Sequence, residues 1–212
     1  MPKLGMQALR RRQLIDATIH TIEAHGFAET TIARISRTAG LSSGIIAHYF
    51  GGKNALLAAT MRSLLSELQR EMIARLRRAR TPVARIEAIL GANFATDQST
   101  PAICAAWLAF YSQVPHSPEL KRLHQTYVRR LRSNLQHAFR QLLPDTAAER
   151  AAEGMSSMID GVWVRAALAR CTPERAGAHE LADDYLRMIL EHYRGPGEPP
   201  DDNGHCAGAM QG

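Results

Sequence analysis

The stretch at residues 39–57 reads AGLSSGIIAHYFGGKNALL and begins with small side chains where a protein core would contain larger ones. Ser42, Ser43 and Gly44 are small enough to let a helix backbone come close to base edges in the major groove of DNA. A serine hydroxyl can form a hydrogen bond with a base edge or a phosphate, and Ile45 can lie against a thymine methyl group. This order of residue types is therefore typical of the first turn of a DNA-reading helix.

The second half of the stretch carries groups that suit phosphate. His48 and Tyr49 are candidates for phosphate contacts that fix the position of a helix on the duplex. Lys53 opens the next predicted helix, where its charge adds to the positive end of the helix dipole. The alternative is a plain helical hairpin, in which Ile46 and Phe50 belong to a core and the serines only cap a helix. The two interpretations are compatible.

Three short helices are predicted to position this stretch. Apolar spacing predicts the first over about 6–25, and Thr30 or Thr31 can cap a second that ends near Gly40. Ser42 is the expected N-cap of the third, which ends before the glycine pair. Two short helices joined by a tight turn form a helix-turn-helix, which holds its second helix at the surface.

Charge is distributed unevenly along the chain. The net charge is +6, and residues 1–60 carry seven Lys and Arg against three Asp and Glu, so they hold a surplus of four. A basic segment in a chain of pI about 9.6 is the electrostatic pattern expected of contact with a polyanion.

Composition and motifs exclude several other classes. The chain has 212 residues, no apolar run approaches the ~20 residues of a membrane span, and no secretory signal is present, so we expect a cytoplasmic protein. Cys104, Cys171 and Cys206 have no metal-ligand or disulfide spacing, and we expect inert thiols rather than a redox switch. Without an HExxH motif, a phosphate loop or a GxSxG elbow, the sequence predicts no metal, no cofactor and no enzyme.

The remainder of the chain predicts further helices and no strand, so the expected fold class is all-α. A long amphipathic helix should start at Lys53 and end before Thr81-Pro82. Further helices are expected at about 82–95, 102–113, 117–142, 147–170 and 178–193. The predicted organisation is a helix-turn-helix domain at 1–52, with the motif itself at about 31–50, a helical domain at 53–193 and a disordered tail at 194–212.

Aromatic and acidic residues recur together on the helices of the larger domain. Trp107, Phe110 and Tyr111 share one helix face because they lie three and four residues apart. Two further pairs combine an aromatic ring with a carboxylate at a spacing of three, namely Phe94 with Asp97 and Asp160 with Trp163. Aromatic faces beside a negative charge can hold an organic cation.

The same residues have a structural interpretation. The rings can be ordinary core, Asp97 can lie at a helix end, and Asp160 can form an ion pair with Arg130 or Arg165. Small residues also allow close helix approach beside apolar ones in the same region, which fits either a dimer face or internal packing. They are Gly154, Ser157 and Gly161, beside Met155, Met158 and Val162.

The sequence resembles the TetR family of bacterial repressors in the segment LIDATIHTIEAHGFAETTIARISRTAGLSSGIIAHYFGGKNALL. Further segments, including GANFATDQ, AWLAFYSQ, RRLRSNL and IDGVWVRAAL, resemble the BetI subgroup, the choline-responsive repressors of glycine betaine synthesis. The likeness spans residues 1 to about 193. Many members of the family have a tyrosine or another polar residue where this chain has Ala47.

The resemblance implies a homodimer formed through the last two helices, which binds double-stranded operator DNA and is released by an effector in the larger domain. The DNA contacts that it implies fall on Thr31, Arg34, Ser42, Ser43, Gly44, Ile45, His48, Tyr49 and Lys53. The implied effector is choline, a quaternary ammonium that cannot donate a hydrogen bond from nitrogen, so aromatic rings and a carboxylate would have to hold it. The candidate residues for that site are Phe94, Asp97, Trp107, Phe110, Tyr111, Asp160 and Trp163.

Three other functions stay open at this point. One is a regulator of the same family that responds to a different hydrophobic or cationic molecule, such as a drug or a fatty acyl compound. Another is an enzyme that uses Asp160 with a histidine. The third is a basic helical protein that binds polyanions or membrane surfaces without sequence preference.

Overall fold

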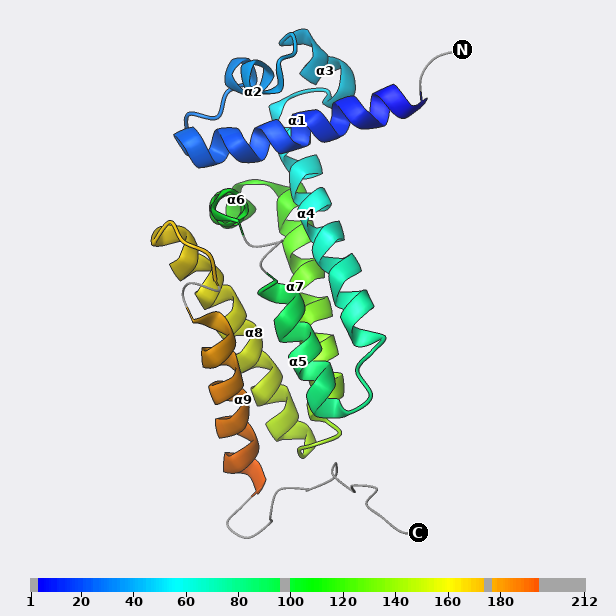
Figure 1. Ribbon diagram of the computed structural model, residues 1–212, viewed down its shortest axis with the longest axis vertical. Helices are drawn as coiled ribbons and strands as arrows, with labels where there is room; N and C mark the ends of the chain where they lie inside the picture. Colours follow the sequence, from blue (N-terminus) through cyan, green and yellow to red (C-terminus); the bar gives the residue numbers. More distant parts are fainter. Residues whose placement is uncertain (1–3, 96–99, 174–176, 195–212) are drawn as a thin grey trace, which may run out of the picture.

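The computed structural model describes residues 4–95, 100–173 and 177–194, and these residues form helices and turns without a strand. The all-α fold class is confirmed. The helices are α1 (Leu4–His25), α2 (Ile32–Ala39), α3 (Gly44–Phe50), α4 (Lys53–Leu76), α5 (Pro82–Asn93), α6 (Pro101–Gln113), the short 3-10 helix η2 (Val114–His116), α7 (Pro118–Phe139), α8 (Asp145–Leu168) and α9 (Ala178–Arg194). Helices α1 to α3 form a small head at one end of an elongated bundle, and α4 leads from the head into the bundle (Figure 1).

The head is held together by helix caps and a small apolar core. Thr31 caps the N-terminus of helix α2, where its hydroxyl accepts a hydrogen bond from the Arg34 amide at 3.2 Å, and Gly40 caps the C-terminus. Gly40 has a φ of 64°, a left-handed conformation that favours glycine. Four apolar side chains with no exposed surface fill the core, namely Leu14, Ile35, Ile46 and Leu56. Since Leu56 belongs to α4, the head is packed directly onto the first turn of that helix.

The start of α3 differs from the prediction that Ser42 caps it. The helix begins at Gly44, and Ser43 lies at the N-cap position without a hydrogen bond from its side chain to the helix. The physical reason is conformational, because Ser43 already has helical backbone angles, with φ −61° and ψ −31°. Both serines are exposed at the start of the helix.

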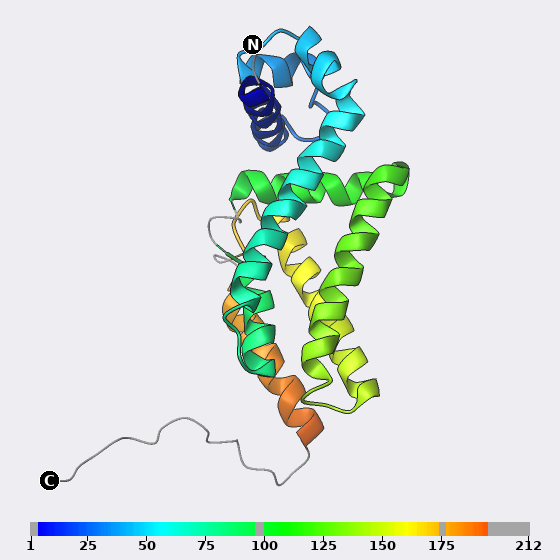
Figure 2. The ribbon, with the colours of Figure 1, turned by 90° about the vertical axis from the view of Figure 1, so that its right-hand side faces the viewer.

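Three helices of the bundle begin with the same capping arrangement. Thr81, Thr100 and Ser117 each accept a hydrogen bond from the backbone amide three residues later, and each is followed by a proline at the first helical position. A capping hydroxyl satisfies a free helix amide, and proline has none to lose there. Helices α4 to α9 then pack around a second, larger core, while α6 lies across the end of the bundle beneath the head (Figure 2).

The last two helices leave part of their apolar surface uncovered. Leu168, Leu181 and Met188 are exposed by 68%, 39% and 65%. Apolar spacing in the sequence predicts that Leu181, Tyr185 and Ile189 face inward. The prediction is wrong for Leu181, because the buried face of α9 is formed by Ala182, Leu186 and Ile189.

The predicted stripe of small residues on α8 is divided between two surfaces. A side chain at Gly154 would collide with the Tyr185 hydroxyl of α9, so this glycine serves close packing within the chain. Met155 and Val162 are buried in the chain's own core, whereas Ser157 and Gly161 are exposed.

The described residues contain neither a group of metal-ligating side chains nor a helix long and apolar enough to cross a membrane. Cys104 and Cys171 are free thiols, and burial raises the pKa of Cys104 to about 12, which keeps its thiol protonated. Cys206 and the predicted disordered tail beyond residue 194 lie outside the described residues.

Arg11 of α1 anchors the end of α3, and its removal should destabilise the head. Its guanidinium lies 4.3 Å from the centre of the Phe50 ring and donates a hydrogen bond to the Tyr49 carbonyl. We expect Arg11→Ala to lower the free energy of unfolding by about 1 kcal/mol in urea denaturation. Arg10→Ala is the matched control, because Arg10 bonds only Gln13 of its own helix. Equal losses from the two variants would contradict the anchoring role.

Candidate functional sites

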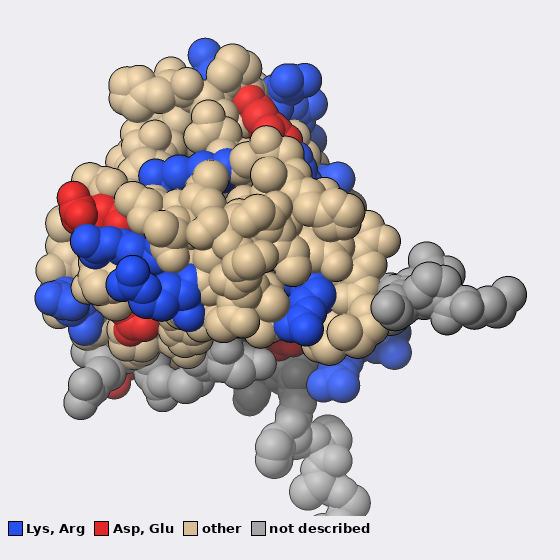
Figure 3. Space-filling view, turned by 90° about the horizontal axis from the view of Figure 1, so that it is seen from above, with Lys and Arg blue, Asp and Glu red and all other residues tan. Residues whose placement is uncertain are grey.

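Helix α3 presents the residues expected to read DNA on its outer side. Gly44 and His48 are exposed, Ile45 and Tyr49 are partly buried, and Ile46 is fully buried beneath them. Seen from the end of the molecule that carries the head, Lys and Arg side chains lie mostly toward the edges, and uncharged residues occupy the centre (Figure 3). This separation suits a protein that contacts bases with small or apolar groups and phosphates with the surrounding polar ones.

The candidate phosphate contacts have partners within the head. Arg34 lies 3.1 Å from Glu29 in an exposed ion pair, and the His48 and Tyr49 rings meet edge to face at 4.9 Å. Lys53 is the first residue of α4, and its ammonium lies 5.3 Å from the centre of the Phe27 ring. Each cation is thus held at the surface of the head. Arg11 was not among the predicted residues, and it contacts Tyr49 and Phe50 at the end of α3.

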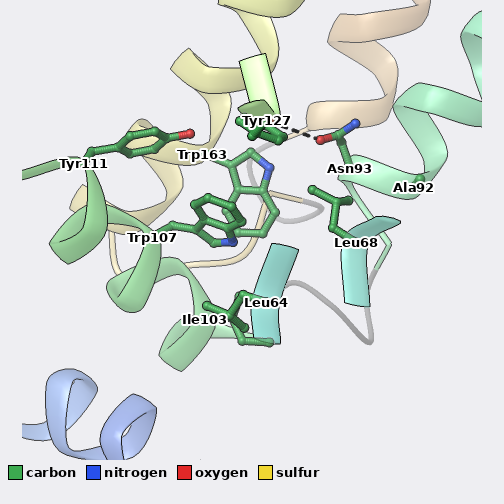
Figure 4. Close-up of a pocket in the computed structure, with 9 residues that line it drawn as sticks. All are labelled: Leu64, Leu68, Ala92, Asn93, Ile103, Trp107, Tyr111, Tyr127 and Trp163. Atoms are coloured by element: carbon green, nitrogen blue, oxygen red, sulfur yellow. Dashed lines mark hydrogen bonds between the residues drawn. The ribbon is translucent and has the colours of Figure 1, made fainter. Parts of the chain in front are cut away.

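A second site lies inside the bundle, where five helices enclose a small cavity of about 20 Å³ (Figure 4). Its walls are Leu64 and Leu68 of α4, Ala92 and Asn93 of α5, Ile103, Trp107 and Tyr111 of α6, Tyr127 of α7 and Trp163 of α8. The volume is room for about one water molecule, so a larger ligand must push side chains apart.

Three of the predicted effector residues meet at this cavity. The Trp107 ring centre lies 6.1 Å from that of Trp163 and 6.0 Å from that of Tyr111. Tyr127 completes the cluster at 5.8 Å from Trp107 and was missed by the sequence analysis. The sequence does contain a signal for it, because Tyr127 follows Leu120 and Leu123 at helical spacing on the apolar face of the predicted helix.

Three predicted residues, Phe94, Phe110 and Asp160, do not line the cavity, and one cannot be placed. Phe94 is buried against His179 of α9 at 5.8 Å, because α5 ends at Asn93 and the helical spacing assumed for Phe94 and Asp97 does not continue. Phe110 packs against Trp107 but lines a different pocket together with Ile22 of α1 and Leu57 of α4. Asp97 lies outside the described residues.

Asp160 reaches the cavity through a hydrogen bond. The Tyr111 hydroxyl donates to its carboxylate at 3.0 Å, and no ion pair to Asp160 occurs among the described residues. The predicted alternative, an ion pair with Arg130 or Arg165, is wrong, because Arg130 instead bonds Gln69 at 3.0 Å and Arg165 is exposed. Burial raises the pKa of Asp160, while the Tyr111 hydrogen bond and the nearby His124 oppose that rise.

The polar groups of the cavity are neutral or negative. Burial and the charge of Asp160 raise the pKa of Tyr127, and burial raises that of Tyr111, so both hydroxyls stay protonated. The Tyr127 hydroxyl lies 3.5 Å from the Asn93 side-chain oxygen. With four aromatic rings, one carboxylate behind them and no basic residue in the lining, the cavity suits an organic cation better than an anion.

Comparisons with known proteins agree with this architecture. Residues 14–60 match the family described as "Bacterial regulatory proteins, tetR family", and residues 82–191 match "BetI-type transcriptional repressor, C-terminal". The HTH-type transcriptional regulator BetI of Brucella melitensis biotype 2 is 45% identical over 203 residues, which is 96% of this chain and 100% of that protein.

Two solved structures share the fold. A putative transcriptional regulator from Pseudomonas aeruginosa PAO1 has a TM-score of 0.72 at 27% identity, covering 86% of this chain and 91% of that one. A putative transcriptional regulator from Saccharomonospora viridis, solved in complex with choline, has a TM-score of 0.71 at 16% identity, covering 85% of this chain and 96% of that one.

A small head with a surface helix after a tight turn, joined to a larger helical domain, is the architecture of a helix-turn-helix transcriptional regulator. The chain belongs to the TetR family and carries the BetI-type repressor domain. It is a DNA-binding transcriptional repressor rather than an enzyme, and regulators of this family bind operator DNA as dimers.

The buried carboxylate makes stability depend on pH. Because the folded state raises the Asp160 pKa, ionisation of this group disfavours folding, and its contribution is lost as pH rises through the raised pKa. Asn cannot ionise and still accepts the Tyr111 hydrogen bond. We therefore expect Asp160→Asn to gain stability over the wild type as pH rises from about 4 to 7 in urea denaturation. A difference that stays constant with pH would contradict this.

Proposed function

We propose that this protein represses genes for the conversion of choline to glycine betaine, an osmoprotectant, and leaves its operator when choline or a close relative binds in the cavity. The observation that carries the proposal is the cluster of Trp107, Trp163, Tyr111 and Tyr127 around a site that has no Arg or Lys among its lining residues and the Asp160 carboxylate behind Tyr111. A quaternary ammonium offers no donor on nitrogen, so ring faces and a carboxylate are the groups able to hold it. Each ring contributes ~0.5 to 2 kcal/mol once water is excluded.

Two findings support choline among the possible cations. The BetI-type match covers the helices that form the cavity, except α4. The Saccharomonospora viridis protein that shares this fold binds choline in its solved structure. The alternative is a TetR-family regulator of a different hydrophobic or cationic small molecule, which the same aromatic lining would accept.

DNA reading is assigned to α3 and its neighbours. In this proposal Ser42, Ser43, Gly44 and Ile45 approach base edges, because all four lie at the outer end of α3. The surrounding groups contact phosphates and set the register, namely Thr31, Arg34, His48, Tyr49 and Lys53.

The dimer is assigned to the outer faces of α8 and α9. Ser157, Gly161 and Leu168 share one face of α8, and Leu181 and Met188 share one face of α9, since they are spaced by four or seven residues. These residues expose apolar surface that a second copy would bury. A two-fold dimer would place the reading helices ~34 Å apart, one turn of DNA, on a near-palindromic operator.

The effector assignment is tested by calorimetry and operator binding with choline. Wild-type protein should bind choline with heat and lose operator affinity, whereas Asp160→Asn should bind operator normally and keep it in the presence of choline. The matched control ligand is 3,3-dimethylbutan-1-ol, the uncharged carbon analogue of choline, which should neither bind nor release DNA. Absence of heat and of operator release with wild-type protein would remove the choline proposal, and equal binding of the uncharged analogue would favour a merely hydrophobic effector.

The reading helix is tested by base preference and salt dependence. Ser43→Ala and Ile45→Ala should change the preferred bases, because these side chains are assigned to base edges. Lys53→Ala should weaken all sites alike and reduce the salt slope by about 1, because a phosphate contact is lost. Arg187→Ala, at an exposed position of α9, is the control and should change neither. Unaltered preference in the Ser43 and Ile45 variants would show that α3 does not read bases.

A further inference from the structure

A second hollow lies next to the aromatic cavity, on the other side of two side chains. It is an open groove of about 680 Å³ between α4 and α7. Its floor is largely apolar, with Leu65, Met72, Leu123 and Leu131 among its lining residues. Leu68 and Tyr127 line both the groove and the closed cavity, so these two side chains form the wall between them.

Both side chains pack against the main core, and the polar contacts that hold this wall are weak. The Tyr127 hydroxyl lies at the long limit of a hydrogen bond, 3.5 Å from Asn93, and Leu68 and Tyr127 are only partly buried. Across the groove, two polar contacts join α4 to α7, namely the exposed Arg62–Glu119 ion pair and the Arg130–Gln69 hydrogen bond. Exposed pairs of this kind contribute little to stability, so they leave α4 free to separate slightly from α7.

We propose that the groove is the access route of the effector, which reaches the cavity by displacing the Leu68 and Tyr127 side chains. The proposal rests on the proposed binding of an organic cation in the cavity. It explains how a ligand larger than about 20 Å³ reaches the cavity without the core being opened, because Leu68 and Tyr127 are the residues that line both the cavity and the groove. It also places the opening motion on α4, the helix that carries the reading head.

The charged residues of the groove predict how entry of a cation depends on ionic strength. Arg129 and Arg130 line it, while the charge of Arg62 is balanced by Glu119. A cation passing these arginines meets repulsion that salt screens. The association rate constant of choline should therefore rise with ionic strength. A route lined by carboxylates would show the reverse. An association rate constant that falls with ionic strength would overturn the proposal.

The chain offers a matched pair of variants for a direct test. Leu64 and Leu68 lie one turn apart on α4 and both line the cavity, but only Leu68 also lines the groove. The chain has two tryptophans, Trp107 and Trp163, and both line the cavity, so selectively excited tryptophan fluorescence reports on the site alone. Acrylamide, a small neutral quencher, probes access without depending on which effector binds.

Leu68→Ala should raise the acrylamide quenching rate constant severalfold over wild type, and Leu64→Ala should leave it nearly unchanged. In stopped-flow fluorescence with choline, Leu68→Ala should raise the association rate constant, whereas Leu64→Ala should change mainly dissociation. Equal quenching in the two variants, or faster quenching in Leu64→Ala, would overturn the route. Failure of choline to bind wild-type protein would remove the proposed effector, while the quenching comparison would still decide the route.

Discussion

A continuous helix, α4, carries both the reading head and one wall of the cavity, and this constraint organises the remainder of the structure. Its first turns bury Leu56 in the head core, and its middle places Leu64 and Leu68 at the cavity. A helix transmits a displacement along its length because its backbone hydrogen bonds resist bending. In the proposed mechanism, a ligand that separates α4 from α7 therefore also moves α3.

A second connection runs through α6. Trp107 and Tyr111 on one side of this helix line the cavity, while Ala109 on another side packs with Ile22 of α1 and Leu57 of α4 in a small separate cluster. Small residues at that contact let α1 and α6 lie close together. The head thus contacts the larger domain through α4 and through α6. A rearrangement of the aromatic cluster can be transmitted along both helices, which suits a switch between two discrete arrangements.

Burial of Asp160 lowers the stability of the fold, and in the proposed function its carboxylate takes part in binding. A buried carboxylate disfavours the folded state once it ionises, and a purely structural core would replace Asp160 with an apolar or amide residue. Among the described residues no Arg or Lys forms an ion pair with Asp160, so in the proposed function its charge is available to a bound cation. Functional sites commonly sacrifice stability in this way.

Much of the fold was predictable because its signals are local. Hydroxyl and proline pairs such as Thr81-Pro82 mark helix starts, and the helical spacing of Met155, Ile159 and Val162 in the sequence agrees with the buried face of α8. The errors arose where a decision depends on another element. The spacing of Leu181 cannot reveal which face of α9 the bundle covers, and the meeting of Tyr127 with Trp107 depends on how two helices pack.

The coupling between cavity and head can be measured as a distance. Spin labels at Ala47→Cys, on the exposed side of α3 in each subunit, with Cys171 and Cys206 replaced by serine, report the separation of the two reading helices by double electron–electron resonance. Without ligand we predict a separation near one turn of DNA, ~34 Å, that shifts when choline saturates the site. A distribution that stays unchanged while choline alters the tryptophan fluorescence would contradict the coupling of cation binding to DNA release through α4.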